Sequence, residues 1–181
     1  MRSKLIVMMI IGFLLTLTIG CDQIATGTFV FSEEIDEEIQ TSNTVIDMVA
    51  VDLTLNEDYM DHRDDIISVD EISIIGTFEN MHSSNTASGE AWLAFYGGHM
   101  TADEVRDDPD AFLVFVSPDI APGTTFEIEW SEAPVYMRNV DDFADVIIED
   151  GQFWIYGLGS GEEFDFHIDV DILITVTIGY N

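Results

Sequence analysis

The C-terminal part of the chain carries the longest alternation of apolar and polar residues in the sequence. From Phe164 to Ile178 every second residue is apolar, and the residues between them begin with Asp165, His167 and Asp169. A period of two places successive side chains on opposite faces of a β-strand, so one face is expected to be buried. At about 3.3 Å per residue the segment would span roughly 50 Å. That length is large for one sheet, and a bend or bulge is predicted where the outer face becomes less polar.

Shorter segments elsewhere also have the patterns of strands. Alternation or short apolar runs predict strands at residues 45–55, 69–80, 90–96, 111–116, 124–131 and 152–156. The apolar face of the first of these segments would carry Val45, Val49, Val51, Leu53 and Leu55. The polar residues 56–65 are expected to form a loop.

One segment changes to helical spacing. Between Val140 and Ile148 the apolar residues recur at intervals that place them on one face of a helix. Asn139 can cap the N-terminus of this helix, and Gly151 can end it. The sequence therefore predicts one short helix near residues 139–150.

These segments together define the predicted fold. Strands separated by turns, with little helix, are typical of an antiparallel β-sandwich. We expect a mainly β protein in which residues 45–181 form a single sandwich of about seven or eight strands. A single helical turn is expected after Thr101, because Thr101 and Glu104 have the spacing of a capping box.

Acidic residues dominate the charge of the chain. There are 36 of them against five basic residues, which gives a formal net charge of −31. Such a charge repels the phosphate backbone, so nucleic-acid partners are excluded. The acidic residues are densest between Glu33 and Glu38. We interpret residues 21–44 as a solvated acidic tether that includes a short first strand at Thr28–Phe31.

The chain begins with a short basic segment followed by an apolar run. Arg2 and Lys4 precede an uncharged stretch from Leu5 to Ile19. A helix needs roughly 20 apolar residues to span a bilayer. This shorter run favours a cleaved secretory signal peptide over a permanent transmembrane anchor. Residues 1–20 are therefore predicted to direct export.

Cys21 is the single cysteine of the sequence. An exported chain with one cysteine cannot form an internal disulfide, and lipidation would remove an otherwise free thiol. Together with Thr18, Ile19 and Gly20, Cys21 resembles the lipobox of bacterial lipoproteins. The resemblance implies that Cys21 becomes a lipidated N-terminus. It also implies a membrane partner, with the domain held on the outer side of the bacterial plasma membrane or in the outer membrane.

Two groups of aspartates are candidate ligands for Ca²⁺, because carboxylate oxygens are the ligands that this ion prefers. One group lies in the polar stretch 56–65 and the other on the outer face of the last predicted strand. The candidates are Asp58, Asp61, Asp64, Asp65, Asp165, Asp169 and Asp171. Same-face positions of a strand are about 7 Å apart, so the second group would need ligands from another loop. The alternative is an acidic surface that is merely solvated.

The sequence lacks a convergent catalytic motif, and it predicts an exported, lipid-anchored binding or structural module at the cell envelope rather than an enzyme. Its ligand would be a protein or a glycan. One alternative is a polysaccharide hydrolase that uses an Asp/Glu pair, with Trp92, Tyr96, Trp154 and Tyr156 as a sugar platform. Aromatic residues at alternating positions are more often core residues. A further alternative is an assembly subunit that pairs through an exposed edge strand.

Overall fold

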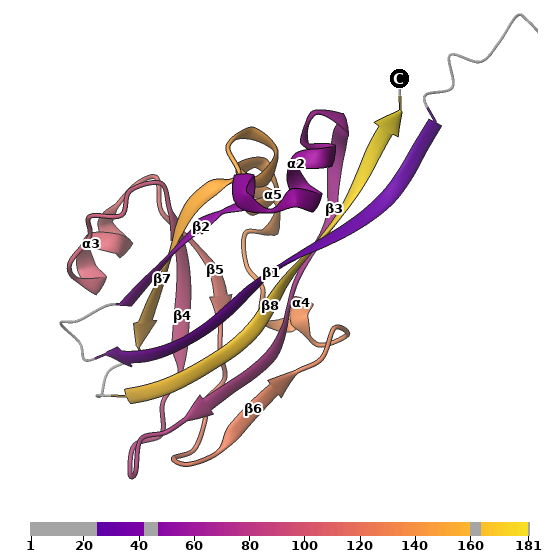
Figure 1. Ribbon diagram of the computed structural model, residues 1–181. Coiled ribbons are helices and arrows are strands. Elements are labelled where there is room, and N and C mark those ends of the chain that lie inside the picture. The colour runs from indigo at the N-terminus through magenta and orange to yellow at the C-terminus, as the bar shows by residue number, and fades with distance from the viewer. Residues whose placement is uncertain (1–24, 42–46, 160–163, 181) are drawn as a thin grey trace, which may run out of the picture.

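The computed structural model describes residues 25–41, 47–159 and 164–180. They form two four-stranded sheets in which every strand pairing is antiparallel (Figure 1). The first sheet has the order β1-β8-β3-β6, and its strands are β1 (Ala25–Thr41), β8 (Phe164–Tyr180), β3 (Ile66–Asn80) and β6 (Thr125–Ile128). The second sheet has the order β2-β7-β4-β5, and its strands are β2 (Asp47–Asp52), β7 (Gln152–Gly159), β4 (Gly89–Ala94) and β5 (Phe112–Val116). The predicted antiparallel β-sandwich is confirmed.

The predicted C-terminal strand is β8, which lies between β1 and β3 in the first sheet. Its even-numbered residues from position 166 to 178 point toward the core, and Phe166, Val170 and Ile174 among them are buried. The expected irregularity lies in the partner strand rather than in β8. Register shifts occur in β3 between Ile66 and Ser68 and between Val69 and Glu71, opposite the less polar end of β8. The bulges bend the sheet without interrupting the pairing of β8 with β1.

Strand β1 corrects the prediction of an acidic tether. The residues from Ala25 to Thr41 pair with β8 one by one, so the acidic stretch is the middle of a 17-residue strand. Phe31, Ile35 and Ile39 are buried. Their spacing of four residues is a multiple of two, which places all three on the face that contacts the core. The tether interpretation was wrong for these residues because acidic side chains separate the apolar ones.

The segment after β1 also differs from the prediction. The expected strand at 45–55 is limited to β2 and is followed by a 3-10 helix at Leu53–Leu55. The side chain of Asp52 accepts a hydrogen bond from the backbone N–H of Thr54, which turns the chain at this point. Leu53 is buried as predicted, whereas Leu55 is exposed. Val45 lies outside the described residues.

The polar stretch 56–65 is helical instead of a loop. It forms α2 (Glu57–His62) and a 3-10 helix at Arg63–Asp65. The side chain of Asn56 caps α2 by accepting the N–H of Tyr59. The ring of Tyr59 is fully buried, and its hydroxyl donates to the carbonyl of Ile147 at 2.7 Å. One buried aromatic residue thus fixes this short helix to the rest of the fold.

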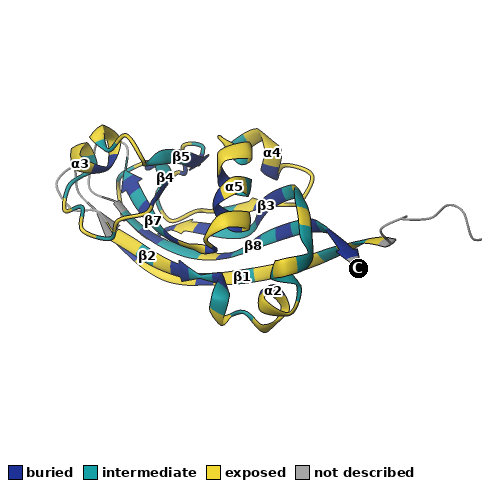
Figure 2. Cartoon of the chain, turned by 90° about the horizontal axis from the view of Figure 1, so that it is seen from above, coloured by how far each residue is buried: buried dark blue, intermediate teal, exposed yellow. Residues whose placement is uncertain are grey.

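The predicted helix near 139–150 is α5 (Val140–Glu149). Phe143, Val146 and Ile147 are its buried residues. The helix contacts β3 of the first sheet and β7 of the second, and its outer side is exposed (Figure 2). Gly151 ends it with a φ of 67°.

The start of α5 differs from the prediction. Asn139 does not cap the helix with its side chain, which instead donates to the carbonyl of Leu113. Asn139 has a φ of 46°. Its side chain therefore joins the helix to β5 rather than satisfying the first turn.

Two further helices complete the described structure. α3 (Ala102–Asp107) has the predicted capping box between Thr101 and Glu104 and extends beyond the single turn expected. α4 (Ala133–Tyr136) was not predicted. Across residues 25–41, 47–159 and 164–180, no helix combines the length and the hydropathy that crossing a membrane requires.

Candidate functional site: a pocket between the two sheets

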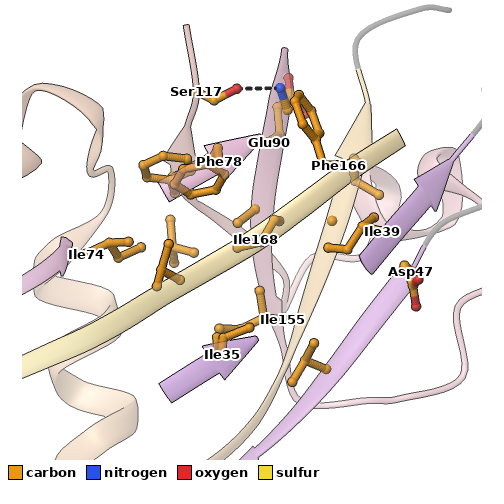
Figure 3. A pocket seen from close by; sticks show the side chains of 18 of the residues that line it. Ile35, Ile39, Asp47, Ile74, Phe78, Glu90, Ser117, Ile155, Phe166 and Ile168 are labelled. Atoms are coloured by element: carbon orange, nitrogen blue, oxygen red, sulfur yellow. Dashed lines mark hydrogen bonds between the residues drawn. The ribbon is translucent and has the colours of Figure 1, made fainter. Parts of the chain in front are cut away.

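A pocket lies between the two sheets at the end of the sandwich where β1 finishes and β2 begins (Figure 3). We call it the interior pocket, and its volume is about 90 Å³. The first sheet lines it with large apolar side chains, including Ile39, Ile74, Phe78, Phe166, Ile168 and Val170. These side chains come from three neighbouring strands, β1, β8 and β3, and all face the second sheet.

The second sheet is what leaves this space open. At the inner-facing positions of β4 and β7 it carries Gly89, Ala91 and Gly157, and Ala91 pairs directly with Gly157. A Cβ atom added at Gly157 would lie 3.3 Å from Cδ1 of Ile39, a close contact. Small residues on one sheet therefore face large ones on the other, and the side chains do not fill the space between them. Well-packed interiors have few voids larger than a water molecule, so this pocket is a departure from ordinary packing.

The polar residues of the pocket wall are almost all turned to other partners. Glu90 accepts hydrogen bonds from Trp92 Nε1 at 2.9 Å and from Arg106 at 3.0 Å, and strand alternation places these contacts on the outer face of the second sheet. Ser117 Oγ accepts the N–H of Gly89 at 2.7 Å and donates to the carbonyl of Pro118. The interior that a ligand would meet is consequently apolar.

The pocket reaches solvent at the edge of strand β2. Of the described residues that line it, Asp47 and Met48 are the exposed ones. Asp47 Oδ1 accepts the backbone N–H of Met48 at 2.9 Å. Strand β1 contributes Ile35 and Ile39 to the pocket, and both side chains are buried. An apolar interior with a carboxylate at its entrance is suited to binding an apolar group.

The seven predicted calcium ligands do not gather in one place. Asp58 and Asp61 lie on α2, Asp64 and Asp65 lie in the following 3-10 helix, and the other three lie on β8. Within residues 25–41, 47–159 and 164–180, no group of three or more His, Cys, Asp or Glu side chains is close enough to hold a metal ion. The calcium site stays a prediction, to be tested in solution.

The three β8 aspartates belong to an acidic outer face of the first sheet. Asp169 and Asp171 lie directly opposite Asp36 and Glu34 of β1. His167 on the same face is hydrogen-bonded to Asp36 through Nε2 at 2.9 Å. This hydrogen bond raises the pKa of His167 above its ordinary value. When His167 is protonated, its imidazolium offsets part of the like-charge repulsion across these two strands.

The aromatic residues considered as a sugar platform lie mostly under α3. Tyr156 is fully buried and donates its hydroxyl to the carbonyl of Tyr96 at 2.8 Å. Burial raises the pKa of Tyr156. The ring of His99 stacks on Tyr156, and its Nε2 is 2.8 Å from Asp108. Trp92 and Trp154 pack against the same cluster, whereas Tyr96 is 64% exposed. These contacts fasten α3 to the outer face of the second sheet and leave no stacked row of exposed rings among the four.

Sequence reasoning missed the interior pocket. The signal was present in the small residues Gly89, Ala91 and Gly157, which stand among apolar and aromatic neighbours. Gly157 lies just beyond the strand predicted at 152–156, whereas in the structure it lies inside β7. Cys21 lies outside the described residues.

Comparisons with known proteins leave the family open. No known protein family matches the chain, and no curated protein matches it. One similar solved structure is a chain from Desmodium yellow mottle tymovirus, with 9% sequence identity and a TM-score of 0.38. The alignment covers 91% of this chain and 95% of that chain. A likeness at this score supports no statement about function.

Proposed function

We propose that this protein is an exported, lipid-anchored binding module that takes an apolar ligand into the interior pocket. The pocket carries the proposal, because large apolar side chains on one sheet face Gly89, Ala91 and Gly157 on the other and leave about 90 Å³ unfilled. An engineered apolar cavity of about 150 Å³ takes up benzene, and the smaller interior pocket would take up the end of an apolar chain. This proposal replaces the protein or glycan ligand expected from the sequence with an apolar one.

Two other functions considered from the sequence have less support. A hydrolase of this kind needs two carboxylates that face one cleft. Asp47 and Glu90 are the acidic residues among the described pocket residues. Glu90 is hydrogen-bonded to Trp92 and Arg106, so Asp47 has no second carboxylate to act with. Assembly through an edge strand would use the long strand β1, but Glu33 and Glu37 occupy two of the inner-facing positions of this strand. Inward-pointing charges on an edge strand oppose pairing with another chain.

The anchoring part of the proposal depends on Cys21. Replacing Cys21 by serine removes the thiol that would carry the lipid, so the protein is expected to leave the membrane fraction or to accumulate as uncut precursor. Fractionation with labelling by a radioactive fatty acid measures both outcomes. A Ser3→Ala variant, changed in the same leader, should be processed normally. Unchanged lipid labelling and processing of Cys21→Ser would contradict the anchor.

The binding part is tested by filling the interior pocket. The Ala91→Leu variant places a branched side chain in it, so a small apolar probe such as 1-octanol should no longer raise the melting temperature. For the unmodified protein, a probe at a hundredfold excess over its Kd should stabilise the folded state by about 2.7 kcal/mol. Thermal unfolding with and without 1-octanol measures the effect.

Matched variants separate pocket filling from general damage. Ala50→Leu makes the same change at an exposed position of β2, and it should retain the full response to 1-octanol. Gly89→Ala adds one methyl group with contacts no closer than 3.7 Å, so it should fold and show a reduced response. An equal response from the unmodified protein and Ala91→Leu would rule out the interior pocket as the binding site.

A further inference from the structure

The charges around the interior pocket favour one kind of ligand head group. Among the described residues that line the pocket there is no lysine, arginine or histidine. At its entrance stands the exposed carboxylate of Asp47. Arg106 is engaged with Glu90. Any group held at the entrance therefore lies in a negative potential.

The size of the pocket limits the apolar part of the ligand. A volume of about 90 Å³ is smaller than the cavity of about 150 Å³ that accepts a benzene ring. It can hold the terminal carbons of one slender alkyl chain, whose remaining carbons would extend to the entrance, but not two chains or a fused ring system. The chain would lie between Phe166 and Ile168 on one side and Ala91 on the other, with its polar end at Asp47 (Figure 3).

We infer that the ligand is a single-chain amphiphile with a cationic head group, its chain in the interior pocket and its head beside Asp47. This inference rests on the proposed function, because it specifies the ligand of the same pocket. A carboxylate or phosphate head would be repelled by Asp47 and by the net charge of −31. An uncharged hydroxyl head could donate a hydrogen bond to Asp47 but would lack the ion pair that an ammonium group would form with it.

The experiment compares three probes that share one alkyl chain: octylammonium, 1-octanol and octanoate. Titration calorimetry on the purified protein at low salt should give octylammonium at least about threefold tighter than 1-octanol, the effect of one solvent-exposed ion pair. Octanoate should bind most weakly. The preference for octylammonium should shrink in high salt, because screening weakens exposed charge pairs.

Variants assign the preference to Asp47. In Asp47→Asn the affinity for octylammonium should fall to the affinity that the same variant has for 1-octanol. Asp145→Asn makes the same change of charge on an exposed position of α5 and should leave the preference intact. Ala91→Leu should abolish binding of octylammonium, which distinguishes the pocket from the acidic surface.

The possible results separate this inference from the proposed function. Equal affinity for the three probes, or tighter binding of octanoate, would overturn the inference of a cationic head group. The proposed binding of apolar chains in the pocket would stand. Octylammonium binding that survives in Ala91→Leu would place it on the outer surface and would also overturn the inference. Failure of 1-octanol itself to bind would remove the proposed function together with the inference.

Discussion

Replacing Gly76 by alanine is expected to lower the free energy of unfolding by about 3 kcal/mol or more. Gly76 has a φ of 132°, a conformation that residues with a side chain rarely adopt. An added Cβ atom would lie 2.7 Å from Cα of Val170 and still closer to the carbonyl oxygen of Asp169. Both atoms belong to the backbone of β8, which is paired on both sides. The backbone strain at position 76 and the steric overlap with β8 therefore add, because β8 is held by a neighbouring strand on each side and cannot move away.

Denaturant unfolding of purified Gly76→Ala measures the loss. Gly123→Ala is the matched control, because Gly123 also has a positive φ of 65° but no neighbouring atom within 4 Å of an added Cβ. Its cost should be limited to backbone strain, about 1 kcal/mol. Similar losses in the two variants would show that close approach between β3 and β8 at Gly76 is not the cause.

The parts of the fold predicted correctly were those with a local signal. Strand β8 has a buried residue at every second position, and this alternation requires no knowledge of its partners. Helix α5 has apolar residues at helical spacing and Gly151 at its end. The start of α3 was predicted from its capping box. In each case neighbouring residues along the chain contain the whole pattern.

The elements that were missed depend on contacts distant in sequence. Strand β1 has acidic residues at two inner-facing positions, Glu33 and Glu37, which is permitted because it lies at the edge of its sheet. Because these charged residues interrupt the apolar positions, the alternation that places Phe31, Ile35 and Ile39 on one face is not evident from the sequence. Helix α2 is short and polar, and it is held by the burial of one tyrosine against α5.

The interior pocket could not be predicted because it arises from the register between strands. Gly89, Ala91 and Gly157 are far apart in the sequence or lie next to turns, where glycine usually marks a bend. They create a space only because β4 and β7 pair with Ala91 opposite Gly157 and because Ile39 and Phe166 face them from the other sheet. Neither relation follows from a local pattern.

The acidic outer face of the first sheet makes stability depend on salt. Glu34 lies opposite Asp171, and Asp36 lies opposite Asp169. Like charges directly opposite each other on neighbouring strands destabilise the pair by about 0.2–1 kcal/mol. Screening relieves this repulsion, since the screening length falls to about 3 Å in 1 M salt. The purified protein is therefore expected to melt about 1–8 °C higher in molar NaCl than in low salt.

Calcium tests whether any of these carboxylates form a specific site. If the predicted ligands bind Ca²⁺ in the folded state, millimolar calcium will raise the melting temperature more than NaCl at the same ionic strength, because binding adds a term of RT ln(1 + [L]/Kd). Changing Asp58, Asp61, Asp64, Asp65, Asp165, Asp169 and Asp171 to asparagine should then remove the excess. Differential scanning calorimetry measures both salts. Equal shifts in the two salts would mean that the acidic residues act only as a solvated surface. A melting temperature that changes in neither salt would contradict the repulsion between β1 and β8.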